Sequence, residues 1–169
     1  MTSDKDWVSG RTCVYNIGYH IVWSTKYRRK VIEGEIEIRL KALFKEIAGD
    51  FEFEIKEMEV MPDHCHVFVS CHPKKAPSDI VKCLKGISAR KLLLEFPVIK
   101  KKLWGGHLWN PSYYIGTVGN MSKDVVLRYI QQQKAEGTGK FTSPNDRHLA
   151  LHPLFEKRGI SAIHSKDFR

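Results

Sequence analysis

The sequence predicts an α/β sandwich in which one antiparallel sheet carries two helices, with the elements in the order β-α-β-β-α-β. Apolar and polar residues alternate in residues 13–23 and 51–56, which is the period of half-buried strands, and a third strand is predicted at 64–70. Apolar residues recur at helical spacing in residues 36–47 and 80–94. A fourth strand-like stretch follows at 108–118. This order is that of the ferredoxin-like fold, which RNA-recognition (RRM-like) domains share.

The first strand is predicted between Cys13 and Trp23, where aromatic and β-branched residues occupy the odd positions. The helix after it is expected to end near Gly49, because glycine commonly terminates helices. Met61-Pro62-Asp63 is typical of a tight connection between two strands. We therefore expect His64 to begin the third strand.

The second helix is expected to be capped by Ser78, with Asp79 in its first turn, and to stop at Phe96-Pro97. A further C-terminal helix is predicted after Gly119 and would carry Tyr129. By composition we divide the chain into a flexible N-terminus (1–12), one domain (13–136) and a C-terminal extension of unknown role (137–169).

The charge of the chain favours a polyanionic partner. Its 169 residues include 28 Lys+Arg and 19 Asp+Glu, for a formal net charge of +9, and such an excess favours nucleic acid first and anionic membrane second. The segment 26–30 interleaves a tyrosine with cations, as single-strand binders often do, although a solvated basic face gives the same pattern. From charge placement alone, the candidate DNA contacts are Arg28, Arg29, Lys82, Lys85 and Arg90.

The cysteines and the hydropathy pattern indicate a cytoplasmic protein. The four cysteines form no Cys-x-x-Cys pair, so reduced thiols are the simplest account. No apolar run approaches the ~20 residues of a membrane span, and the first dozen residues lack the apolar centre of a secretion signal.

A His-x-His pair is the first candidate for chemistry. On a strand, His64 and His66 would share one face and Cys65 would point to the other. Such a pair is more often two ordinary histidines than a metal site. Two imidazoles with one neutral amide oxygen nevertheless suit Mg²⁺ or Mn²⁺ with open positions for a phosphate oxygen. Zinc held by these residues with Cys71 and His72 is disfavoured, because Cys65 points away and no zinc spacing appears.

Tyr129 and Gln133 lie one helical turn apart and would project side by side. A helical tyrosine usually packs a helix onto a sheet. A phenol beside a metal could also attack a phosphodiester, because the metal activates the phosphate. The resulting phosphotyrosine would keep the energy of the original bond. Tyr113 and Tyr114 are competing candidates, but they lie in a strand-like stretch without a partner amide.

Six segments follow one another along the chain in a recognisable order: Tyr19–Lys30, Met61–His66, Leu84–Ser88, Leu103–Trp109, Ser112–Gly119 and Arg128–Gln133. Together they resemble a known family, the single-tyrosine HUH transposases (TnpA type) of small bacterial and archaeal insertion sequences. The chain departs from the family at Cys65, where the family has a bulky hydrophobic residue, and a free cysteine behaves as a small hydrophobe.

The resemblance implies the roles of the candidate residues. His64, His66 and Gln133 would hold a divalent metal, and Tyr129 would be the nucleophile that leaves a 5′-phosphotyrosine and a free 3′-OH. The family further implies a homodimer that recognises DNA hairpins and cleaves single strands, with an active site that the two subunits can share. Three alternatives stand beside an insertion-sequence transposase: a related nickase acting on palindromic repeats or replication origins, a non-catalytic RNA- or single-strand-binding module, and an inactive relative serving as a DNA-binding regulator.

Overall fold

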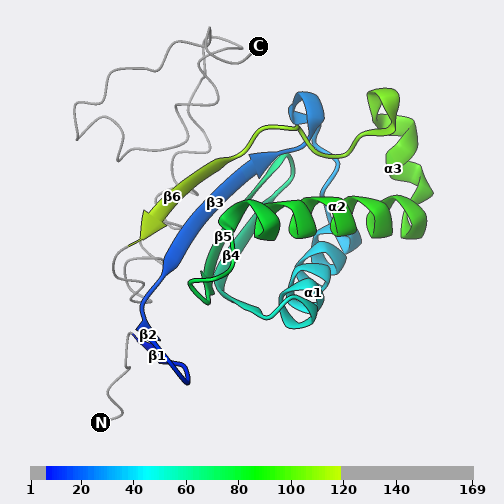
Figure 1. Ribbon diagram of the computed structural model, residues 1–169. Coiled ribbons are helices and arrows are strands. Elements are labelled where there is room, and N and C mark those ends of the chain that lie inside the picture. Colours follow the sequence, from blue (N-terminus) through cyan, green and yellow to red (C-terminus); the bar gives the residue numbers. More distant parts are fainter. Residues whose placement is uncertain (1–6, 119–169) are drawn as a thin grey trace, which may run out of the picture. The chain divides into compact units, whose positions relative to one another are not determined.

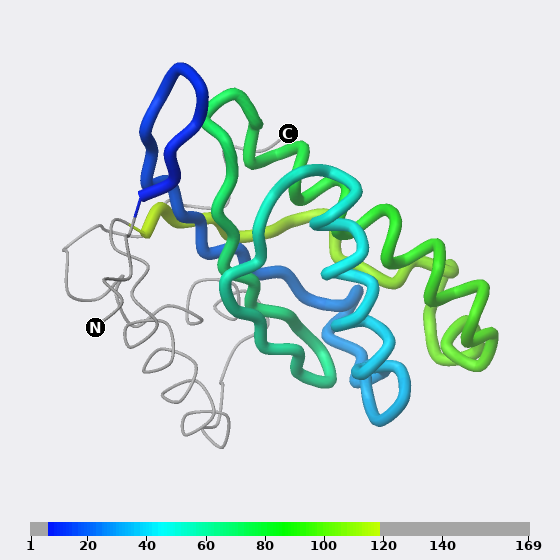
Figure 2. Tube along the Cα trace, turned by 90° about the horizontal axis from the view of Figure 1, so that it is seen from below, coloured from blue at the N-terminus to red at the C-terminus, as the bar shows by residue number. Residues whose placement is uncertain are grey.

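The computed structural model describes residues 7–118, which form a four-stranded sheet with two helices on one face (Figures 1 and 2). The main elements are β3 (Gly18–Ser24), α1 (Glu35–Asp50), β4 (Phe53–Met61), β5 (His64–Cys71), α2 (Pro77–Glu95) and β6 (Tyr114–Val118). The strand order is β4-β5-β3-β6 and every neighbouring pair is antiparallel. The predicted ferredoxin-like fold is therefore confirmed, while the predicted C-terminal helix lies outside the described residues.

Shorter elements surround this sheet. They are β1 (Val8–Ser9), β2 (Val14–Tyr15), the 3₁₀ turn η1 (Lys26–Arg28), α3 (Pro97–Lys102) and the 3₁₀ turn η2 (Trp104–Gly106). The strand predicted at 13–23 is thus two strands, of which β2 pairs with β1 and β3 joins the main sheet. The fourth strand is shorter than predicted, because Trp109 makes only an isolated bridge to Thr25 before β6 begins. None of the helices in residues 7–118 is long and apolar enough to cross a membrane.

Both main helices differ slightly at their ends from the sequence prediction. Helix α1 continues through Gly49 to Asp50, because the Phe51 N–H still bonds to the Ile47 carbonyl. Helix α2 begins at Pro77 rather than after a Ser78 cap. Proline suits the first helical position, since its missing N–H would have no partner there. The predicted stop at Phe96-Pro97 is confirmed.

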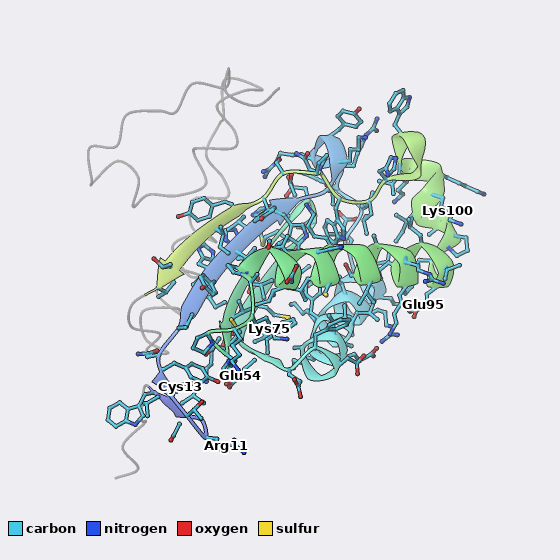
Figure 3. The ribbon with its side chains drawn as sticks, in the orientation of Figure 1. Arg11, Cys13, Glu54, Lys75, Glu95 and Lys100 are labelled. Carbon is cyan, nitrogen blue, oxygen red and sulfur yellow. The ribbon has the colours of Figure 1, made fainter. Side chains whose placement is uncertain are left out.

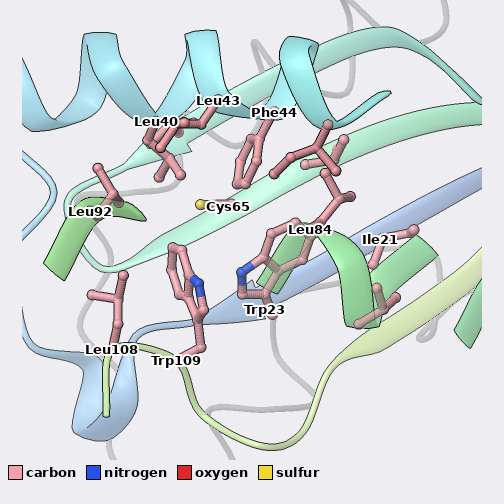
Figure 4. Packing of buried hydrophobic residues seen from close by; sticks show 14 of the residues in the cluster. Ile21, Trp23, Leu40, Leu43, Phe44, Cys65, Leu84, Leu92, Leu108 and Trp109 are labelled. Atoms are coloured by element: carbon pink, nitrogen blue, oxygen red, sulfur yellow. The ribbon is translucent and has the colours of Figure 1, made fainter. Parts of the chain in front are cut away.

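The core lies between the helices and the inner face of the sheet (Figure 4). Trp23 of β3 is at its centre, with ring centroids 5.6 Å from Phe44 and 5.9 Å from Trp109, both edge-on. The Trp109 indole N–H donates to the Ser88 hydroxyl at 3.1 Å. Burying each large apolar side chain contributes about 1.5–3 kcal/mol. Trp109 therefore fastens the segment that leads into β6 onto α2.

Candidate metal and nucleophile site

His64 and His66 occupy the face of the sheet opposite α1 and α2. His66 pairs with Val22 of β3 and Glu59 of β4, so it lies on a central strand. The rings of the two histidines have centroids 5.1 Å apart. Cys65 is completely buried in the core on the other face. The shared face expected from strand alternation is confirmed, and it separates Cys65 from the two imidazoles.

His66 is held by a third histidine. Its Nδ1 lies 3.1 Å from Nε2 of His20, and both side chains are buried. The His20 ring is stacked on Phe68, with centroids 4.3 Å apart and planes 8° from parallel. Because Nδ1 of His66 is engaged, Nε2 is the nitrogen that would bind a metal, as in many sites where a neighbour fixes the tautomer of a ligating histidine. Sequence reasoning missed His20, although the same strand alternation puts it on the histidine face.

His64 is held by a carboxylate. Its Nδ1 lies 2.6 Å from Asp63 Oδ1, and Asp63 Oδ2 accepts a hydrogen bond from Arg28 Nε at 3.0 Å. Partial burial alone would raise the pKa of Asp63, but the contacts with His64 and Arg28 outweigh it and hold that pKa below its usual range. Asp63 is therefore ionised near neutral pH. A carboxylate in this position orients an imidazole and makes it a better ligand.

The backbone around Asp63 explains why Arg28 reaches it. The buried Thr25 side chain donates to the carbonyl of Arg29 at 2.8 Å and is 3.2 Å from that of Asp63. Tyr27 and Arg28 then adopt left-handed conformations, with φ of 57° and 51°, which is uncommon outside glycine, asparagine and aspartate. The β4–β5 turn and η1 are thus tied together, and this brings Arg28 over Asp63.

Two of the three predicted metal ligands, His64 and His66, lie among the described residues. No cluster of three His, Cys, Asp or Glu side chains that could hold a metal occurs within 7–118. Two imidazoles on one face, each with Nδ1 held by a neighbour, nevertheless suit a divalent cation bound through the Nε2 atoms with further positions open. The predicted third ligand Gln133 and the predicted nucleophile Tyr129 both lie outside the described residues.

Tyr114, a competing nucleophile, lies on the same sheet face, opposite Val22 on β6. Burial raises the pKa of its phenol, so the phenolate needed for attack is less accessible than in a free tyrosine. Its hydroxyl also lies close over Gly116, where a Cβ would come within 2.6 Å. These features favour a packing role for Tyr114.

The five basic residues predicted to contact DNA do not gather at one place. Arg28 is beside the histidines, and Arg29 lines a pocket next to η1. Lys82 and Arg90 line an open groove of about 1350 Å³ along α2. The Lys85 ammonium donates to the carbonyls of residues 110, 111 and 112 at 2.6, 2.9 and 3.3 Å, and burial lowers its pKa. Lys85 therefore holds the chain's own loop before β6.

Comparison with known proteins identifies the family. A family model described as "Transposase IS200 like" matches residues 13–133. The chain belongs to the IS200-like transposases. It is 46% identical over 124 residues to the ISDra2 transposase TnpA of Deinococcus radiodurans, covering 73% of this chain and 89% of that protein. It is 32% identical over 123 residues to the IS200 transposase of Salmonella typhimurium, covering 72% and 80%.

Solved structures agree with the fold of this transposase. A crystal structure of a proposed transposase from Deinococcus radiodurans aligns with a TM-score of 0.63 at 40% identity, over 75% of this chain and 97% of that one. A REP-associated tyrosine transposase, bound to a REP hairpin, aligns with a TM-score of 0.53 at 17% identity, over 87% and 88%. The resemblance noted in the sequence is therefore confirmed at the level of family and fold.

Proposed function

We propose that this transposase cleaves and rejoins single-stranded DNA at the ends of an insertion sequence through a 5′-phosphotyrosine on Tyr129. The arrangement of His64 and His66 carries the proposal, because both share one sheet face and each has its Nδ1 held by a neighbour. Membership of a transposase family supports the same conclusion. Gln133 completes the proposed ligand set.

The proposed chemistry is a metal-assisted transesterification. A bound Mg²⁺ or Mn²⁺ supplies Lewis-acid polarisation of the scissile phosphate. His64 and His66 would hold the cation through Nε2, and Asp63 would keep the His64 ring in its ligating orientation. The Tyr129 oxygen attacks phosphorus, the bond to the 3′ oxygen breaks, and the phenolic proton passes through solvent to that oxygen. Attack by another 3′-OH on the phosphotyrosine phosphorus then breaks the bond to the Tyr129 oxygen, which takes up the proton, and so rejoins strands without ATP.

The proposed substrate is single-stranded DNA that carries hairpins, and the proposed assembly is a homodimer whose active sites the subunits can share. The formal net charge of +9 supports a nucleic-acid substrate. The REP hairpin in the structural neighbour supports hairpin recognition in this chain. The homodimer is inferred from the family resemblance.

The test is to trap the covalent intermediate. The protein is incubated with single-stranded DNA from both flanks of its own gene, with Mn²⁺ or with EDTA, and the products are run on a denaturing gel. We expect a metal-dependent adduct at the 5′ side of the cut that is absent in Tyr129→Phe and present in the control Tyr113→Phe. An adduct that persists in Tyr129→Phe would refute the assignment of the nucleophile.

A further inference from the structure

Two aromatic rings stand exposed at the end of the sheet where β3 leads into η1. Tyr27 of η1 is 62% exposed and Trp104 of η2 is 70% exposed. Their ring centroids are 6.1 Å apart with an interplanar angle of 69°. Large aromatic surfaces are normally buried. A pair of contacting rings that both remain open to solvent therefore needs a reason.

The backbone is unusual beside both rings, but only at Tyr27 is it strained. Tyr27 has a left-handed φ of 57° although it is not glycine. Trp104 is followed by Gly105 and Gly106, with φ of 69° and 70°, a region that other residues rarely adopt. Conformations of this kind persist where the surrounding structure enforces them, and they cluster at binding sites.

The surroundings of the two rings are basic. Lys26 Nζ lies 5.5 Å from the centroid of the Tyr27 ring. Trp104 borders a pocket of about 510 Å³, whose other lining residues are Arg29, Lys30, Val31, Lys101, Lys102 and Leu103. Within the described part of the chain, this lining contains four cations and no carboxylate. Stacking rings flanked by cations are the composition of surfaces that bind single-stranded nucleic acid, where bases stack and phosphates pair with cations.

These rings adjoin the histidine site. Tyr27 is followed directly by Arg28, which contacts Asp63 and approaches His64 Nδ1 to 3.5 Å. On the other side, the Lys26 N–H donates to the Leu108 carbonyl at 2.8 Å, which ties η1 to the segment that follows η2. A DNA strand lying across the rings would therefore be adjacent to the end of the sheet where His64 begins β5.

We infer that Tyr27 and Trp104 form a stacking platform for unpaired bases of the single-stranded DNA next to the histidine site. The inference rests on the proposed function and adds a defined subsite to it. Bases rather than phosphates are the matching groups for the two rings, and the neighbouring lysines and arginine would contact the phosphates on either side.

The test measures binding rather than cleavage. Fluorescence anisotropy of labelled oligo(dT) is recorded in EDTA for the full-length protein and for Tyr27→Leu and Trp104→Leu. Stacking of one base corresponds to roughly 5- to 150-fold in affinity, so each variant should lose at least about fivefold. The slope of log K against log salt should stay unchanged in these variants, whereas Lys101→Gln should reduce it by about 0.7.

Trp7 provides a matched control, because it is also exposed, at 55%. It immediately precedes β1, and Figure 3 shows Arg11 and Cys13 of that first hairpin at the opposite end of the molecule from Lys100 of α3. Trp7→Leu should bind oligo(dT) like the wild type. In that variant Trp104 is the single exposed tryptophan, since Trp23 and Trp109 are buried, so oligo(dT) should still quench its fluorescence.

Two results would overturn the platform. One is wild-type affinity for oligo(dT) in Trp104→Leu. The other is that the leucine variants lose as much affinity for an abasic strand of the same length as they lose for oligo(dT). The abasic strand carries the same charge but has no bases to stack. Tyr27→Asn, whose side chain tolerates a left-handed backbone, guards against misfolding of Tyr27→Leu. The adduct assay separates the two proposals. If the wild type forms the adduct but the leucine variants bind oligo(dT) with wild-type affinity, the platform alone is refuted. If the leucine variants lose affinity but the wild type forms no adduct, the cleavage chemistry alone is refuted.

Discussion

Replacing Asp63 should weaken metal binding without removing a ligand. Asp63 accepts a 2.6 Å contact from His64 and a 3.0 Å hydrogen bond from Arg28, and its side chain is 15% exposed. A hydrogen bond to a charged group contributes about 1.5–3 kcal/mol, and partial exposure favours the lower end. Since about 1.4 kcal/mol is a factor of ten, Asp63→Ala should lower the Mn²⁺ affinity roughly tenfold, in the range typical of residues that orient metal ligands.

Isothermal titration with Mn²⁺ measures this directly in the absence of DNA. His64→Ala is the reference for loss of a ligand and should lose more affinity than Asp63→Ala. Asp79→Asn is the control for the change in net charge, because Asp79 is an exposed residue at the start of α2, on the opposite face of the sheet. Wild-type Mn²⁺ affinity in Asp63→Ala, with clear loss in His64→Ala, would refute the orienting role of the carboxylate.

Three further predictions follow from the described contacts. His20→Phe keeps a ring against Phe68 but removes the partner of His66 Nδ1, so titration should show an Mn²⁺ affinity roughly tenfold weaker; unchanged affinity would contradict the His20–His66 contact. Trp109→Phe removes the hydrogen bond to Ser88 and should lower the free energy of unfolding, measured in urea, by about 1–3 kcal/mol. A loss under ~0.5 kcal/mol, which is the scatter of neutral surface changes, would mean that this hydrogen bond does not stabilise the fold. Because the folded pKa of Asp63 is lowered, its stabilisation is present above the unfolded pKa of about 3.9 and is lost as pH falls through the folded value. Acid titration below about pH 5 should therefore destabilise the wild type more than Asp63→Asn, and parallel curves would argue against the shift.

The order of the elements could be predicted because periodicity reports burial. β4 and α1 have one face or stripe against the core, so their apolar residues recur at about two or about 3.6 residues. The segment before β6 misled the prediction, since its aromatic residues suggest a strand. Trp109 is instead an anchor on α2, and the loop after it is held by Lys85 through backbone carbonyls. Such contacts join residues far apart in the sequence and leave no local pattern.

In the candidate site, too, one feature could be predicted from the sequence and two contacts could not. The shared face of His64 and His66 follows from strand alternation alone. The Asp63–Arg28 ion pair does not, because it depends on left-handed backbone at Tyr27 and Arg28. The His20–His66 contact requires the register between β3 and β5, in which Val22 is opposite His66. Register depends on the hydrophobic patterns of both strands together and on the connections between them, so the sequence of either strand alone does not give it.

The proposed site has two parts. The histidine part, His64 and His66, belongs to the described sheet, whereas Tyr129 and Gln133 lie outside the described residues. Both histidines belong to β5, which is hydrogen-bonded to β3 on one side and β4 on the other. Their spacing is therefore set by the sheet and does not depend on the tyrosine. Loss of the phenol should accordingly separate the two activities: Tyr129→Phe should bind Mn²⁺ with wild-type affinity while forming no adduct, whereas His66→Ala should lose both. A parallel loss of Mn²⁺ binding in Tyr129→Phe would mean that the histidine part is not preorganised by β5.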